Sequence, residues 1–199
     1  MRPIIALYNL IKNNQKKDMT VAEIGVYDGI TTKTYIDIIA NNNGKIYAVD
    51  WFCGNENVDG IHAYNPNLAD IVYDKFLTNI APYKHIVDIK KGKSHEMIGL
   101  IPDRSLDLCF IDADHRYSSV YKDIELCLPK MKPNSIICGH DCENINLANT
   151  PESLLYREQD TANNAHYGVI QAVFDHFGKD IVSLFDPDGQ NVPLWVKHL

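Results

Sequence analysis

Acidic residues and a glycine turn follow four apolar segments that are expected to be β-strands. Gly25 lies in the turn after the first segment, and Asp50, Asp112 and Asp141 follow three later ones. Ligands of parallel sheets bind at the carboxyl ends of the strands. The four positions are therefore predicted to meet in one site at one edge of a sheet.

The turn after the first segment favours a particular ligand. It reads Glu23-x-Gly25-x-x-x-Gly29, and glycine permits positive φ and a close approach of backbone to a ligand. A dinucleotide site has Gly-x-Gly-x-x-Gly facing a pyrophosphate. Here there is one glycine fewer and an acid in front, which suits a ligand with an ammonium group. Asp50 stands where an acid can hold a ribose diol, so an adenosine-based ligand is predicted.

Asp112 and Asp141 are candidate metal ligands. If the two strands that precede them are neighbours, about 4.8 Å apart, their carboxylates come close and repel unless a cation or a shared proton intervenes. Oxygen ligands favour Mg²⁺, Ca²⁺ or Mn²⁺, while His140 beside Asp141 would suit Fe²⁺, Zn²⁺ or Mn²⁺, or else faces the substrate. The alternative is that Asp112 contacts only the organic ligand and no metal binds.

His115 is the candidate general base, because an imidazole that titrates near neutrality can take a hydroxyl proton. It follows Asp112 by three residues, in the sequence Ile-Asp-Ala-Asp-His-Arg-Tyr. The alternative is that His115 only hydrogen-bonds the following loop or helix. Arg116 and Tyr117 are expected to position groups rather than to react.

Two motifs in order carry a family resemblance. The first is the glycine turn with Asp50, and the second is the Ile-Asp-Ala-Asp-His-Arg-Tyr segment, a helix containing Asp123, and Gly-His-Asp closing the next strand. Together they resemble the class I S-adenosylmethionine-dependent methyltransferases. Within that class they are similar to the small-molecule O-methyltransferase branch, which includes the macrocin-type sugar enzymes (methyltransferase family 24-like) and, more distantly, the catechol and caffeoyl-CoA enzymes. The resemblance spans residues 21–141, with a weaker echo at 166–177.

The resemblance implies S-adenosylmethionine as the methyl donor, with a divalent metal such as Mg²⁺ or Mn²⁺ as a further expectation. Asp50 matches the ribose-binding acid and Ser94 the adenine-binding position, while Trp51 could stack on the ring. The related metal-dependent enzymes carry Asp-Asn or Asp-Asp where this chain has His140-Asp141, which leaves the third ligand open. The expected cofactor-binding residues are Glu23, Gly25, Gly29, Thr31, Asp50, Trp51, Ser94 and Asp112; the expected metal ligands are Asp112, His140 and Asp141; and the expected catalytic residues are His115 and Asp112.

Alternating strand and helix patterns predict how these residues are positioned. The fold class is α/β: a single Rossmann-like, doubly wound sheet, mostly parallel, with an antiparallel hairpin at the C-terminal edge. Residues 1–199 are expected to form one domain, with an N-terminal helix within 1–18, a loop at 52–67 beside the ligand and a polar lid at 142–165. Strands are predicted at 20–24, 45–50, 85–90, 106–111, 135–138, 181–185 and 194–197, and helices at 31–40, 68–79, 118–128 and 166–177, with a turn at 186–190.

Composition narrows the range of expected binding partners. The formal net charge is −7 and no basic stripe is present, so nucleic acid, whose binding requires neutralised phosphates, is not an expected partner. The absence of a bilayer-length apolar run, of a signal-peptide pattern and of a CxxC pair among the five cysteines favours a cytoplasmic protein without a membrane partner. The amphipathic N-terminal helix suggests a homodimer.

The sequence thus predicts a methyltransferase that acts on a hydroxyl of a small molecule, of the sugar or natural-product type. Two alternatives remain open. One is a metallohydrolase built on Asp112, His115, His140 and Asp141, which leaves the glycine turn and Asp50 unexplained. The other is a nucleotide-binding scaffold without catalytic activity.

Overall fold

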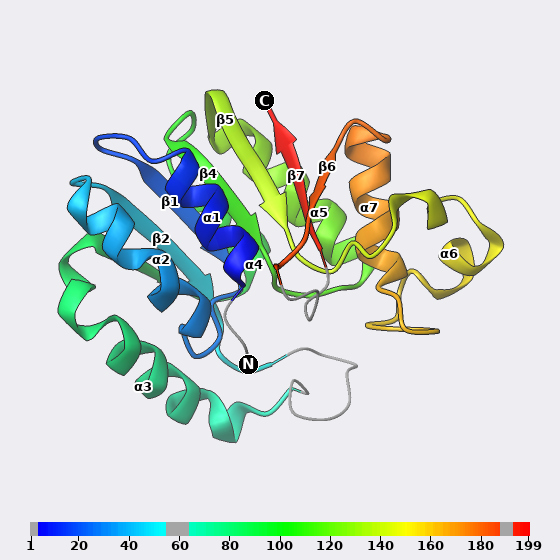
Figure 1. Cartoon of the computed structure of the whole chain (residues 1–199). Helices are drawn as coiled ribbons and strands as arrows, with labels where there is room; N and C mark the ends of the chain where they lie inside the picture. The colour runs from blue at the N-terminus through cyan, green and yellow to red at the C-terminus, as the bar shows by residue number, and fades with distance from the viewer. Residues whose placement is uncertain (1–3, 55–63, 188–192) are drawn as a thin grey trace.

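A seven-stranded sheet with the order β3-β2-β1-β4-β5-β7-β6 forms the centre of the molecule, as Figure 1 shows. A computed structural model describes residues 4–54, 64–187 and 193–199. The strands β1 to β5 run parallel, and β7 pairs antiparallel with both β5 and β6. The predicted α/β class and the antiparallel C-terminal edge are confirmed. The strands are β1 Thr20–Ile24, β2 Lys45–Asp50, β3 Val87–Lys91, β4 Leu106–Ile111, β5 Met131–Gly139, β6 Val182–Leu184 and β7 Leu194–His198.

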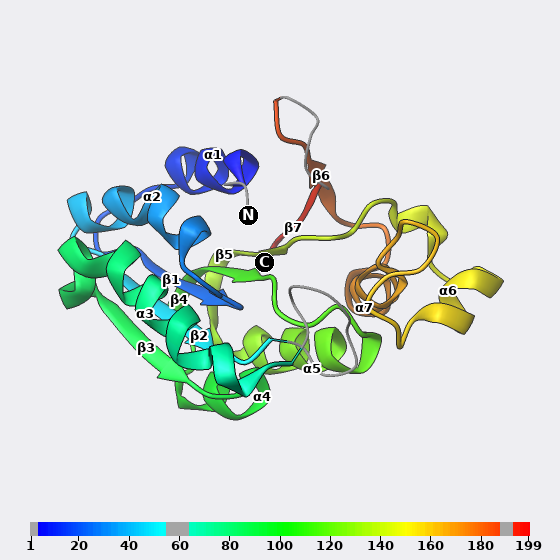
Figure 2. The same cartoon turned by 90° about the horizontal axis from the view of Figure 1, so that it is seen from below.

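Helices cover both faces of the sheet (Figures 1 and 2). Apolar side chains of α1, α2 and α3 pack on one face, and those of α4, α5 and α7 pack on the other. The strands in the middle of the sheet are therefore buried on both sides, which explains why β4 is apolar along most of its length. The helices are α1 Ile5–Asn13, α2 Ile30–Asn41, α3 Ala69–Ile80, α4 Ser94–Met97, α5 Tyr117–Cys127, α6 Pro151–Tyr156 and α7 Tyr167–Phe177.

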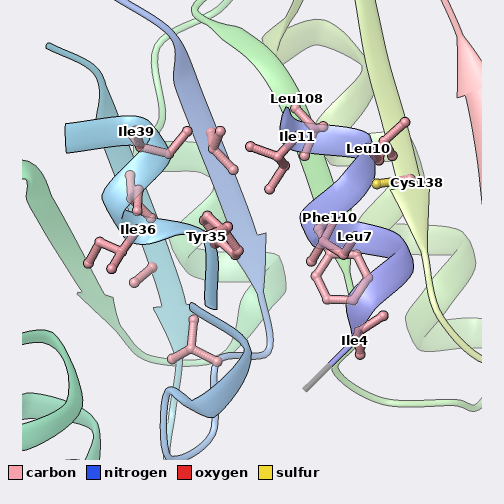
Figure 3. Packing of buried hydrophobic residues seen from close by; sticks show 14 of the residues in the cluster. Ile4, Leu7, Leu10, Ile11, Tyr35, Ile36, Ile39, Leu108, Phe110 and Cys138 are labelled. Atoms are coloured by element: carbon pink, nitrogen blue, oxygen red, sulfur yellow. The ribbon is translucent and has the colours of Figure 1, made fainter. Parts of the chain in front are cut away.

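The N-terminal helix α1 packs against its own sheet. Figure 3 shows Leu7, Leu10 and Ile11 facing Phe110 and Cys138, and all five side chains are buried. The apolar face that suggested a homodimer is therefore already covered within one chain. A dimer stays a prediction, but this helix face no longer supports it.

The strand boundaries differ from the prediction mainly at β5, which begins at Met131 rather than at residue 135. Its pairing with β4 shifts between Leu106 and Leu108, so the extra residues lie in a bulge. Pro133 and Asn134 occupy this bulge, and Asn134 has a φ of 58°. A proline cannot donate to the ladder, and for this reason the start of the strand is hidden in the sequence pattern.

The polar segment 142–165 contains a short 3₁₀ turn and α6, and it is fastened to α7 by one buried side chain. The Gln171 Oε1 atom accepts hydrogen bonds from the Asn149 backbone and from the Ser153 hydroxyl, both at 2.9 Å. The Gln171 Nε2 group donates to the side chains of Asn149 and Asp175, at 3.0 and 2.8 Å. Parts of two other predicted segments, the loop at 52–67 and the turn at 186–190, lie outside the described residues.

Candidate active site

A cavity of about 590 Å³ opens at the carboxyl ends of the parallel strands. This volume lies within the range that small-molecule sites occupy, about 300–1,000 Å³. The lining comes from the ends of β1, β2, β4 and β5, as expected for a parallel sheet, and also from α4, from α5 and from the segment before α7. The predicted site residues that line the cavity are Gly25, Thr31, Asp50, Trp51, Ser94, Asp112, His115, His140 and Asp141.

The backbone turn at Gly25 requires glycine. Gly25 has a φ of +92°, and a Cβ atom there would lie 2.1 Å from the backbone oxygen of Asp112. Since no side chain fits at that distance, glycine lets the turn after β1 lie directly against the end of β4. The same turn leaves its backbone facing the cavity, where a ligand can approach it closely.

The Asp50 carboxylate is held in a fixed orientation by backbone amides. The amide of Tyr27 donates to Oδ2 at 2.7 Å and the amide of Phe52 donates to Oδ1 at 2.6 Å. Burial raises the pKa of Asp50, while backbone hydrogen bonds, Phe52 first, lower it, and burial prevails. Because each carboxylate oxygen has a second lone pair, the group can still accept two hydrogen bonds from a diol in the cavity.

Glu23 lies outside the cavity lining that the described residues form, contrary to the expectation that it contacts the cofactor. Its carboxylate is fully buried and accepts hydrogen bonds from the Thr32 hydroxyl at 2.7 Å and from the Tyr35 hydroxyl at 2.5 Å. Successive strand side chains point to opposite faces, and this one enters the helical layer of α2. Burial raises the pKa of Glu23 to about 8.

Gly29 also lies outside the cavity lining of the described residues. It is the N-cap of α2 with a φ of 79°, and a Cβ atom there would lie 2.8 Å from the Phe76 ring. Its role is to start the helix rather than to touch a ligand.

Asp112, His140 and Asp141 come together where β4 and β5 end. One ligand atom from each residue lies within 4.8 Å of the others, and Asp141 Oδ1 is 3.0 Å from His140 Nδ1. Burial, the larger effect, together with the nearby Asp141 raises the pKa of Asp112 even though His140 opposes the shift. The expected approach of the two carboxylates is confirmed, because β4 and β5 are neighbours in the sheet.

The donor atoms at this place fit a divalent cation. Among the described residues, the buried Nε2 atom of His140 has no hydrogen-bond partner, and such an atom in a folded protein calls for an ion or a water molecule. Two carboxylates and one imidazole form a donor set that accommodates Mn²⁺ or a softer divalent ion as well as Mg²⁺. Asp112, His140 and Asp141 are thus the residues that would hold it.

His115 lies between two carboxylates. Its Nε2 atom is 3.1 Å from Asp141 Oδ2, and its Nδ1 atom is 2.7 Å from Asp160 Oδ1. Burial lowers the pKa of His115, but hydrogen bonds to Asp141 and Asp160 outweigh burial and place the pKa well above its usual value. In this arrangement His115 carries a proton at neutral pH, and it must release that proton before it can act as a base.

Three residues of this cluster were not predicted: Glu143, Asp160 and His166. The His166 Nδ1 atom is 2.5 Å from Glu143 Oε1, and the rings of His166 and His115 are 4.6 Å apart, edge to face. Asp160 and His115 are 45 positions apart in the chain. Glu143 follows Asp141 by two residues, but no local spacing links Asp160 and His166 to the strand ends, since only the fold of segment 142–165 brings them there.

The opposite end of the cavity lies by β2 and β3. Ser94, the first residue of α4, hydrogen-bonds the side chain of Asp123 on α5, whose pKa burial raises to about 7. The Lys93 ammonium lies 4.8 Å from the centre of the Trp51 ring. This end has the polar and aromatic groups that a purine ring needs, and Ser94 and Trp51 are the two residues predicted for that purpose.

No helix among the described residues is both long and apolar enough to cross a membrane. A curated relative, the uncharacterized protein y4gI of Sinorhizobium fredii, is 25% identical over 125 residues, which is 62% of this chain. The match covers only 13% of that relative, so the chain corresponds to a small part of it.

Solved structures show the same fold at low sequence identity. The O-methyltransferase TomG from Streptomyces achromogenes, solved with S-adenosylmethionine, has a TM-score of 0.65 at 12% identity, over 96% of this chain and 76% of that one. The O-methyltransferase from Bacillus cereus, solved with S-adenosylhomocysteine, has a TM-score of 0.63 at 16% identity, over 96% and 77%. A family model described as a methyltransferase domain matches residues 22–142. This match covers most of the strands and the whole turn after β1, so the chain belongs to the methyltransferase-domain family.

Proposed function

We propose that the protein transfers a methyl group from S-adenosylmethionine to a hydroxyl of a small molecule, of the sugar or natural-product type. One observation carries the proposal. A single cavity holds the Gly25 turn and the Asp50 carboxylate at one side and the cluster of Asp112, His115 and Asp141 at the other. The first group suits an adenosine with an amino-acid tail, and the second suits a hydroxyl that must lose a proton. The S-adenosylmethionine named for the TomG structure and the S-adenosylhomocysteine named for the Bacillus cereus structure support the choice.

The strand order sets the direction of the bound cofactor. Because the order is β3-β2-β1-β4-β5, Ser94 after β3 and Asp50 at the end of β2 hold adenine and ribose. The turn at Gly25 then receives the amino-acid part, and the methyl group points toward the end of β4. The acceptor occupies the space near Asp112, Asp141 and Asp160.

The residues of the chain mainly align the reactants. S-adenosylmethionine supplies a methyl group on a sulfonium, and the acceptor oxygen displaces S-adenosylhomocysteine while the hydroxyl proton leaves. Holding oxygen, methyl carbon and sulfur in line supplies most of the acceleration. Asp160 keeps the proton of His115 on Nδ1, so that Nε2, on the side of Asp141, is free to take the acceptor's proton once the imidazole is neutral. A divalent cation at Asp112, His140 and Asp141 would lower the pKa of the acceptor hydroxyl.

Segment 142–165 forms the wall of the acceptor site in this proposal, because it contributes Asp160 and is fastened to α7 through Gln171. A small-molecule acceptor suits the acidic chain better than nucleic acid does, since the net charge is −7.

All five cysteines are free thiols, which agrees with the expected cytoplasmic location.

Calorimetric titration with S-adenosylhomocysteine tests the proposal. We expect binding in the micromolar range with one ligand per chain. A metallohydrolase has no use for the Gly25 turn or Asp50, so the absence of any binding would overturn the proposal in favour of that alternative. Binding without turnover on a broad panel of hydroxylated acceptors would instead favour an inactive scaffold.

A further inference from the structure

The cluster at the strand ends contains a second set of metal-binding atoms. His115, Asp141 and His166 each offer one donor atom, and the three atoms lie within 4.8 Å of one another. They come from three separate parts of the fold: the loop after β4, the end of β5 and the residue before α7. Asp141 belongs to this set and also to the set with Asp112 and His140.

We propose that His115, Asp141 and His166 form a cation site of their own, selective for a borderline transition ion such as Zn²⁺, and that an ion bound there stops methyl transfer. Two imidazoles and one carboxylate are the donor set of many zinc sites. Mg²⁺ prefers oxygen ligands and keeps several waters, so it has little affinity for a position with two nitrogens. The set with Asp112 has two carboxylates and one imidazole, so it accepts Mg²⁺ more readily than the set with two imidazoles does.

Carboxylates that hold both imidazole rings support this assignment. Histidines that bind metal commonly give their other ring N–H to a carboxylate, which fixes the ring and its tautomer. For His115 that partner is Asp160, 2.7 Å from Nδ1, and Nε2 points toward Asp141. For His166 the same nitrogen, Nδ1, lies near both acids, 2.5 Å from Glu143 Oε1 and 3.7 Å from Asp141 Oδ1, and the backbone N–H donates to Glu143 at 3.1 Å. Both rings are therefore held in place before any ion arrives.

The charge of the cluster also favours a cation. Four carboxylates surround the two positions, those of Asp112, Asp141, Glu143 and Asp160. One divalent ion at the Asp112 position balances only half of that charge when the histidines are neutral. A second divalent ion bridged by Asp141 balances the rest, as in two-metal sites whose ions share a carboxylate.

The inhibitory part of the inference rests on the proposed function, whereas the binding part does not. The lone pair of His115 Nε2 that would accept the acceptor's proton is the same lone pair that would bind the ion. An ion at this position therefore removes the base and occupies space beside the acceptor. Methyl transfer should stop even when S-adenosylmethionine is bound.

The binding test uses the full chain, freed of metals by a chelator and saturated with S-adenosylhomocysteine, in calorimetric titrations with Zn²⁺ and separately with Mg²⁺. His166→Gln removes a ligand of the proposed site only, Asp112→Asn a ligand of the other site only, and Asp141→Asn a ligand of both. His85→Gln is the matched control, because His85 is exposed and precedes β3, an edge strand separated from β4 by β2 and β1.

We expect Zn²⁺ affinity to fall at least tenfold in the His166 and Asp141 variants and to stay within twofold in the Asp112 and His85 variants. Circular dichroism checks that each variant is folded, and His166→Asp, which restores a ligand, should recover part of the affinity. If the Asp112 variant loses Zn²⁺ binding and the His166 variant keeps it, the site is wrong and the ion belongs with Asp112. Unchanged Zn²⁺ binding in all the variants would equally overturn the proposed site.

A second readout uses the visible spectrum of Co²⁺, which strengthens when nitrogen ligands bind the ion in a site of low coordination number. His166→Gln should weaken these bands and His85→Gln should not. In assays with excess Mg²⁺, micromolar Zn²⁺ should inhibit the unmodified protein, and His166→Gln should raise the inhibitory concentration at least tenfold relative to its own Zn²⁺-free rate. Zn²⁺ that binds at this site without inhibiting would refute the inhibitory part, and a protein that binds Zn²⁺ but not S-adenosylhomocysteine would refute the proposed function alone.

Discussion

Replacing Asp50 by alanine tests the cofactor site most directly. Each Asp50 oxygen already accepts one backbone hydrogen bond, from Tyr27 or from Phe52, and each has one lone pair left for a ribose hydroxyl. A hydrogen bond to a charged group contributes about 1.5–3 kcal/mol. Allowing for non-additivity, the loss of two such bonds should weaken S-adenosylhomocysteine binding by about 2–4 kcal/mol, which is roughly 30- to 1,000-fold.

The measurement is a calorimetric titration at constant ionic strength, with folding checked by circular dichroism. Asp74→Ala serves as the matched control, because Asp74 is an exposed acid on α3. Asp50→Asn keeps one oxygen acceptor and should give a smaller loss than Asp50→Ala. Affinity should also fall as the pH drops through the raised pKa of Asp50, because the protonated group accepts fewer hydrogen bonds. An unchanged dissociation constant for the folded Asp50→Ala protein would refute the assignment of Asp50.

Three further perturbations test other parts of the structure. Gly25→Val should abolish S-adenosylhomocysteine binding in the same titration and lower the melting temperature, because a Cβ atom there meets the Asp112 backbone; measurable binding at an unchanged melting temperature would contradict the close approach. A chelator should abolish turnover and added Mg²⁺ or Mn²⁺ should restore it, while Asp141→Ala should reduce turnover far more than cofactor affinity; full activity of the chelated protein would rule out the metal. Glu23→Gln should flatten the pH dependence of unfolding by urea. The pKa of this acid is raised from 4.5 to about 8 in the folded protein, so the unfolded chain ionises first, and stability falls between pH 4.5 and 8 by an amount on the order of 5 kcal/mol; an equal slope in both proteins would contradict the raised pKa.

The positions of the strands and of the acids that follow them could be predicted from the sequence, because buried parallel strands are short apolar runs and the following residue lies at the ligand edge. Asp50, Asp112 and Asp141 were placed in this way. The position of the Glu23 side chain could not be predicted, because it depends on which face of β1 the residue occupies. A strand buried on both faces has no alternation of polar and apolar residues that reveals the face.

The second half of the candidate site depends on contacts between distant parts of the chain. Asp160 and His166 reach His115 only because segment 142–165 folds back along α7. Gln171, the residue that fastens the segment, looks like any polar residue within an amphipathic helix pattern. The start of β5 was missed for a related reason, because the bulge at Pro133 is defined by its pairing with β4.

The attachment of segment 142–165 to Gln171 separates the choice of acceptor from the stability of the fold, two properties that are often coupled. All the hydrogen-bonding atoms of the Gln171 amide are engaged, toward Asn149, Ser153 and Asp175. The segment is thus anchored on α7, with Arg157 and Glu158 accepting further hydrogen bonds from the start of α5. Replacements between Thr150 and Asp160 can then reshape the acceptor wall while the central strands keep their packing. Acceptor range is thereby open to evolution at little cost in stability. A library confined to this stretch, with Gln171 kept constant, is the natural place to select for new acceptors.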